Sequence, residues 1–117
     1  MATFNKINSF VELLAEKAHN LGADQLVYAL TAAANAPVAT NTVLANLTQV
    51  SYTNLSTRNI TTSSSSQTSG TYKLVVADLV LTASGGSVAA FRYLVLYNDT
   101  ATNDELIGWY DYGSDLP

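Results

Sequence analysis

Two apolar runs on either side of Ser84-Gly85-Gly86 dominate the pattern of hydrophobic positions in this chain. Apolar runs separated by a short Gly-containing loop indicate a β-hairpin, which is predicted over residues 71–99. A three-residue loop with a glycine at positive φ places Asp78 opposite Arg92, whereas a two-residue Gly85-Gly86 loop places Leu79 there. We prefer the first register because an unpaired charge inside an apolar sheet is costly, so Asp78 and Arg92 are a predicted structural ion pair. The same register pairs Val80 with Ala90, Val76 with Leu94 and Leu74 with Leu96.

Residues 1–24 are expected to form an N-terminal arm followed by a helix. The arm shows no clear period. Ser9 and Glu12 fit a capping box, in which the Ser9 hydroxyl accepts from the Glu12 amide. Apolar residues then recur at helical spacing and predict a helix from Phe10 to about residue 20, with Gly22 as its left-handed stop. The alternative is an extended arm whose apolar residues are covered by a neighbouring chain.

Residues 25–117 are predicted to form an antiparallel β domain. Alternating apolar positions predict a strand over 25–32, and Pro37 prevents its continuation. A helical turn is expected over 40–47, with Thr40 or Asn41 as its cap. The serine-rich stretch 63–70 is interpreted as a solvated connector, with a flexible contact loop as the alternative. Further strands are predicted over 47–52, 57–62 and 106–112, with a polar turn over 98–104.

The strands of the predicted hairpin are apolar on both faces, so both faces of the sheet need cover. The strands over 25–32 and 47–52, with the helix, would cover one face. The other face is aromatic and is continued either by Tyr110 and Tyr112 or by Trp109. A second protein chain or the domain's own core would cover it. We expect a single mainly β domain: an antiparallel β-sandwich or jelly-roll-like domain with a short N-terminal helix or arm.

The composition indicates a surface rich in hydroxyl and amide groups. Only 12% of the 117 residues are charged, well below the ~25% of ordinary soluble domains. The chain has no cysteine, so neither a disulfide nor a zinc-thiolate site is expected. Its five basic residues are scattered and the net charge is −4, so we expect no nucleic-acid partner. No apolar run approaches the roughly 20 residues that span a bilayer, and we expect neither a membrane partner nor a Sec-type signal peptide.

Candidate catalytic and metal-binding residues are few. His19 is the sole histidine, and no nucleophile motif accompanies it, so a helix-end or surface role is expected. Late carboxylates are expected to solvate turns and strand ends; they are Asp99, Asp104, Glu105, Asp111 and Asp115. Asn98, Asp99, Asn103 and Asp104 could offer oxygens to Ca²⁺, but the EF-hand spacing is absent. We expect no enzymatic activity, no cofactor and no metal site.

Several phrases of this sequence resemble small proteins encoded among the virion structural genes of tailed bacteriophages. They are NAPVATNTVLANLTQV at 35–50, SSSSQTSGTYKLVVADLVLTASGG at 63–86, FRYLVLYNDT at 91–100 and LIGWYDYGS at 106–114. The resemblance spans most of the chain from Phe4 onward and includes no catalytic motif, so it transfers no functional residue. Family members continue past the Gly-Ser at 113–114, so the end at Pro117 is expected to be either a truncation or a shorter version of the family pattern.

The resemblance and the two-faced sheet together lead us to expect a virion structural protein, a head decoration or cement protein that bridges capsid subunits. The expected partners are the major capsid protein and further copies of this chain, as a trimer. The expected location is the virion, assembled in the bacterial cytoplasm. The expected assembly contacts are Phe4, Ile7, Tyr93, Tyr97, Trp109 and Tyr110. The alternative is a tail or fibre module that binds a host surface glycan, with Trp109 stacking on a sugar.

Overall fold

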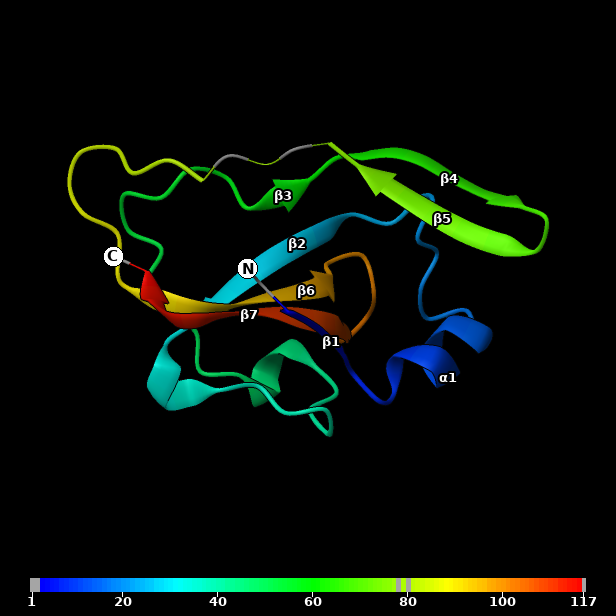
Figure 1. The fold of residues 1–117 in the computed structure, drawn as a ribbon, viewed down its shortest axis with the longest axis horizontal. Helices are drawn as coiled ribbons and strands as arrows, with labels where there is room; N and C mark the ends of the chain where they lie inside the picture. Colours follow the sequence, from blue (N-terminus) through cyan, green and yellow to red (C-terminus); the bar gives the residue numbers. More distant parts are fainter. Residues whose placement is uncertain (1–2, 78, 80, 117) are drawn as a thin grey trace.

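A five-stranded antiparallel sheet forms the centre of the fold, with strand order β1-β7-β6-β2-β3 (Figure 1). The computed structural model describes residues 3–77, 79 and 81–116. A separate two-stranded ribbon contains β4 (Thr62–Thr68) and β5 (Thr71–Val76). The predicted mainly β, antiparallel class is confirmed. The strands of the large sheet are β1 (Thr3–Lys6), β2 (Leu26–Thr31), β3 (Asn59–Ile60), β6 (Phe91–Asn98) and β7 (Leu106–Leu116).

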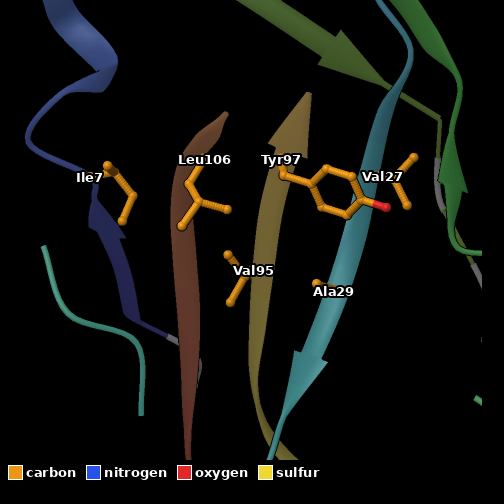
Figure 2. Close-up of a cluster of buried hydrophobic side chains, with 6 residues drawn as sticks. All are labelled: Ile7, Val27, Ala29, Val95, Tyr97 and Leu106. Carbon is orange, nitrogen blue, oxygen red and sulfur yellow. The ribbon is translucent and has the colours of Figure 1, made fainter. Parts of the chain in front are cut away.

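Both faces of the sheet carry buried apolar side chains, and other parts of the same chain pack on each. One face contributes the cluster drawn in Figure 2, which consists of Ile7, Val27, Ala29, Val95, Tyr97 and Leu106. Leu44 and Leu47, from the segment between β2 and β3, pack on this cluster. On the opposite face, Leu74 and Leu79 pack on a second cluster formed by Leu21, Leu26, Ile60 and Ile107. In Figure 1 the first part of the segment between β2 and β3, which contains the two short helical turns, lies below the sheet, and the ribbon lies above it.

The hairpin predicted over 71–99 does not form. Strand β5 ends at Val76 and pairs with β4, so that Leu74 faces Ser65 and Val76 faces Thr62. Strand β6 lies between β2 and β7, where Leu94 faces Leu30 and Tyr110, and Leu96 faces Tyr28 and Gly108. The cause is the turn at Ser69-Gly70, whose φ angles of 52° and 85° are both positive. A two-residue hairpin turn of type I′ requires that geometry, and it closes β5 onto the serine-rich stretch that precedes it.

The predicted ion pair between Asp78 and Arg92 depended on that register, and Asp78 and Val80 lie outside the described residues. Arg92 instead bonds Asp111 of β7, its Nε donating to Oδ1 at 2.8 Å and its Nη2 to Oδ2 at 3.2 Å. Each side chain is 30% exposed. A solvent-exposed pair of this kind adds little to the stability of the fold. A neighbouring strand therefore supplies Arg92 with a carboxylate.

The N-terminal segment is part of the sheet, because the expected arm is the edge strand β1. It pairs with β7 from Thr3 opposite Asp111 to Lys6 opposite Gly108. Helix α1 (Phe10–Ala15) is shorter than predicted, and the capping box is absent. Ser9 has helical backbone angles, φ −74° and ψ −10°, whereas an N-cap residue is extended. Its buried hydroxyl therefore has no hydrogen-bond partner within the described part of the chain.

Helix α1 ends at a Schellman motif centred on Lys17, and not at Gly22. The Ala18 N–H donates to the Leu13 carbonyl at 2.9 Å, and the Lys17 N–H to the Leu14 carbonyl at 3.4 Å. Lys17 has φ +70°. The left-handed region costs a non-glycine residue about 1–2 kcal/mol, and glycine is the residue that usually occupies this position.

Lys17→Gly is therefore expected to raise the free energy of unfolding by about 1 kcal/mol, measured by urea denaturation. The preceding residue, Glu16, has φ −92° and gains nothing from glycine. Glu16→Gly is the matched control and should lower stability by about 0.5–1 kcal/mol. A loss of stability in Lys17→Gly would contradict the left-handed end of the helix.

The remaining expectations are met in part. The strand predicted over 25–32 is β2, and the one predicted over 106–112 is β7, which continues to Leu116. No strand forms over 47–52, where the Val50 N–H bonds the Leu30 carbonyl at 2.9 Å without a ladder. The turn in 40–47 is the 3₁₀ helix η2 (Leu44–Asn46), which follows another, η1 (Ala33–Asn35). Neither Thr40 nor Asn41 caps η2, because the Asn46 Oδ1 accepts the Thr42 and Val43 N–H groups at 2.9 and 3.1 Å.

Candidate functional site

Aromatic side chains gather on the outer strands β1 and β7. Phe4 is paired with Tyr110, and their ring centroids lie 5.0 Å apart. Tyr112 projects from the same face of β7, two residues further on, and meets Phe91 edge to face at 6.5 Å. Phe4 is 45% and Tyr112 39% exposed, while the other two are half-buried. We call Phe4, Phe91, Tyr110 and Tyr112 the aromatic patch.

The aromatic patch has a charged neighbour and an apolar extension. Asp111 lies between Tyr110 and Tyr112 in β7, and its bond with Arg92 holds the pKa of this carboxyl below its usual range. The Gly113 N–H, which donates to Asp111 Oδ1 at 2.8 Å, lowers that pKa further. Tyr112 also lines a cavity of 230 Å³ together with Val76, which is 37% exposed. The exposed apolar surface therefore reaches from β1 to the end of β5.

The residues predicted as assembly contacts are divided between the patch and the core. Phe4 and Tyr110 meet in the aromatic patch. Trp109 projects from the opposite face of β7 and packs, half-buried, on the first core cluster. Ile7, Tyr93 and Tyr97 are 0%, 7% and 5% exposed, so other parts of this chain already cover them. Tyr112 and Phe91 also belong to the patch but were not among the predicted contacts, although the two-residue period of a strand already places Tyr112 on the same face as Tyr110.

A buried polar network joins the end of β6 to the loop after α1. The Asn98 side chain is fully buried, and its Nδ2 donates to Asp24 Oδ2 at 2.6 Å and to His19 Nδ1 at 3.0 Å. Its Oδ1 accepts the backbone N–H groups of Thr100 and Ala101 at 3.0 and 3.2 Å. Because His19 Nδ1 is an acceptor, the proton of the neutral imidazole is on Nε2.

His19 is thus a buried residue and does not occupy the surface position expected from the sequence. It is 4% exposed, and its ring lies 5.3 Å from that of Phe10. Its Nε2 has no hydrogen-bond partner in the described part of the chain. Burial lowers the pKa of His19 from its usual 6.5, while the charges of Glu105 and Asp24 act in the opposite direction.

The free energy of unfolding is therefore expected to fall as the pH drops below 6.5. The unfolded chain then binds a proton at His19 that the folded chain resists, which favours unfolding until the pH also passes the lowered folded pKa. Urea denaturation between about pH 8 and pH 5 measures this effect. His19→Gln should make the free energy of unfolding less dependent on pH just below pH 6.5. An NMR titration that gives His19 a pKa above 6.5 would contradict the prediction.

The late carboxylates Asp99, Asp104 and Glu105 interact electrostatically in the turn between β6 and β7. Burial raises the pKa of Asp104, with smaller contributions from Asp99 and Glu105. Among residues 3–77, 79 and 81–116, no group of three or more His, Cys, Asp or Glu side chains is placed to hold a metal ion. The same residues include no helix of the length and apolar character needed to cross a membrane.

Comparison of the chain with protein-family models, with curated proteins and with solved structures gives no significant match. The surface of the molecule therefore carries the features that bear on function, and the aromatic patch is the most prominent of them.

Proposed function

We propose that this protein is a non-enzymatic structural component of a tailed-bacteriophage virion, a decoration or cement protein of the head. The aromatic patch carries the proposal. Contiguous exposed apolar surface with polar residues at its border is typical of protein interfaces, in which Tyr and Arg are enriched. Phe4 and Tyr112 present large apolar side chains to solvent next to the Arg92–Asp111 pair. The sequence resemblance supplies the virion context.

The proposed mechanism is stabilisation by mass action. A protein that binds the assembled shell and not its dissociated subunits shifts the equilibrium toward the shell. The aromatic patch would bind the major capsid protein and further copies of this chain. The fixed Arg92–Asp111 pair at its border would orient the contact, since charges at the rim set register more than affinity.

The location of the protein in purified particles tests this proposal. Mass spectrometry and low-resolution imaging of the phage that encodes the chain should find many copies on the head. A location restricted to the tail tip, or absence from the particle, would refute the head assignment.

Variants test the role of the aromatic patch in the same particles. Phe4→Ser and Tyr112→Ser should each weaken binding to heads that lack the protein by about 10-fold or more. Val38 is 51% exposed and lies outside the patch, so Val38→Ser is the matched control and should bind as the unchanged protein does. Equal binding by all variants would show that a different surface makes the contact.

A further inference from the structure

A groove of 430 Å³ lies between the ribbon and the end of α1 with the loop that follows it. Ser65 and Tyr72 of the ribbon form one wall, and Leu14 and Lys17 of the α1 end form another. Residues 19–22 complete the lining. In Figure 1 the ribbon and α1 lie at the same end of the molecule, one above the other. The groove thus combines apolar and polar side chains from two separate elements.

Tyr72 gives this groove an aromatic wall of fixed orientation. Its hydroxyl is hydrogen-bonded to Ser65 Oγ at 2.6 Å, and its side chain is nevertheless 48% exposed. Leu14 is 41% exposed. A tethered aromatic ring loses little conformational entropy when a ligand packs on it, because it is already ordered.

His19 also lines this groove, and its Nε2–H is a buried hydrogen-bond donor without a partner among the described residues. Asn98, which is not among the lining residues, occupies Nδ1 from the other side of the ring. The Nε2–H group lacks a partner within the described residues, although His19 is 4% exposed. Buried donors are rarely left unsatisfied, so this one calls for an acceptor.

We propose that this groove binds a pyranose ring of a saccharide. A sugar ring has an apolar C–H face that packs on an aromatic ring, and its hydroxyl groups both donate and accept hydrogen bonds. Tyr72 receives the apolar face. Asn20 and Ser65 offer polar contacts at the walls. His19 Nε2 is closed to solvent in this structure, so it donates to a sugar hydroxyl only when the groove wall opens slightly around the ligand. Lys17, which forms no ion pair with a described residue, provides a donor at the rim.

Other ligand classes fit this groove less well. A purely aliphatic ligand would leave the polar side chains of His19 and Asn20 without partners, which is costly. An anion would find a single cation, Lys17, on a chain of net charge −4. The glycan alternative predicted from the sequence relied on Trp109, which is half-buried against the core. Tyr72 is therefore the aromatic residue that we propose for contact with the sugar. The proposed site is independent of where the protein lies in a particle.

Titration of the ¹⁵N-labelled 117-residue chain with methyl α-mannopyranoside, methyl β-glucopyranoside and methyl β-galactopyranoside tests the proposal. At least one glycoside should shift the amide signals of residues 14–22, 65 and 72, together with the Nε2 signal of His19. A single small sugar is expected to bind with a Kd of about 1–10 mM. No response to any of the three glycosides, or shifts confined to other parts of the chain, would overturn the proposal. A water molecule alone would then account for the Nε2 donor.

Variants of the two walls complete the test. Tyr72→Ala should weaken binding by about 10-fold or more, while Tyr72→Phe keeps the ring and should retain most of it. Val38→Ala is the control, because Val38 is 51% exposed and lies outside both the groove and the aromatic patch, and its affinity for the glycoside should be unchanged. If Tyr72→Ala disorders the ribbon, Leu14→Glu on the α1 side replaces it as the test variant, and it should also weaken glycoside binding. Unchanged affinity in both wall variants, or an equal loss in Val38→Ala, would overturn the proposal.

Discussion

Gly108→Val is expected to lower the free energy of unfolding by about 3 kcal/mol and to detach β1 from the sheet. A Cβ atom at Gly108 would overlap Phe4 Cζ and would lie 2.7 Å from the Asn5 carbonyl oxygen. The phenyl ring has freedom to turn away. The carbonyl belongs to the backbone of β1, so the strand itself would have to move. Since β1 is only the four residues Thr3–Lys6, little else holds it in place.

Urea denaturation and amide hydrogen exchange measure the two parts of this effect. Exchange should accelerate at Ile7, whose N–H donates to the Ile107 carbonyl at 3.0 Å. Gly22→Ala is the control, because a Cβ there would meet only side-chain atoms, Ser65 Oγ at 3.1 Å, Ser65 Cβ at 3.2 Å and Asn20 Oδ1 at 3.8 Å, and no backbone atom. Its cost should stay below about 1 kcal/mol. Equal losses of unfolding free energy in Gly108→Val and Gly22→Ala would contradict the prediction. Slow amide exchange at Ile7 in Gly108→Val would also contradict it.

The same substitution links the fold to the proposed function. Phe4 reaches the aromatic patch only because Gly108 leaves room for its ring beside Tyr110. Displacement of β1 removes Phe4 from the patch while Tyr112 stays on β7. Gly108→Val should therefore weaken binding to phage heads about as much as Phe4→Ser does, although position 108 is buried and contacts no partner.

Individual strands of this fold were predictable from the sequence, but their pairing was not. Alternating apolar residues locate β2 and β7 because each strand is long enough to show the period. The apolar residues of β5 suggested a partner across Ser84–Gly86, since β6 is similarly apolar. The positive-φ turn at Ser69-Gly70 closes a much shorter loop, which costs less entropy, and it selects the polar strand β4 instead. Because β4 is rich in serine, its sequence does not show the apolar pattern of a strand, and its pairing with β5 was not predicted.

The candidate sites depended even more on contacts that are distant in the sequence. A two-residue period shows that Tyr110 and Tyr112 share a face of β7, but it does not reveal which face the loops cover. The segment that carries Leu44 and Leu47 covers the face with Tyr97 and leaves the aromatic patch open. The His19–Asn98 contact spans 79 residues, and no local pattern marks it. That His19 is buried and that its Nε2 has no partner among the described residues can be seen only in the folded structure.

Asn98→Ala is expected to lower the free energy of unfolding by about 3–5 kcal/mol, as the loss of a buried hydrogen-bond network does. The Asn98 side chain takes part in four hydrogen bonds: two donated by Nδ2 and two accepted by Oδ1. Alanine would leave His19 Nδ1 without a donor and the Thr100 and Ala101 N–H groups without an acceptor. These groups lie in a part-buried or buried setting, where desolvation is not recovered elsewhere.

Urea denaturation of four variants separates this network from a general effect of removing an asparagine. Asn59→Ala is the control, because Asn59 is exposed at the edge strand β3, and its cost should stay within about 0.5 kcal/mol. Asp24→Ala combined with Asn98→Ala should cost less than the sum of the single losses by about 1 kcal/mol or more, since Asp24 and Asn98 share a bond of 2.6 Å. Strict additivity, or a loss in Asn98→Ala no larger than in Asn59→Ala, would mean that the loop after α1 is held to β6 by packing alone. The groove beside His19 would then lack the rigid support on which its proposed ligand depends.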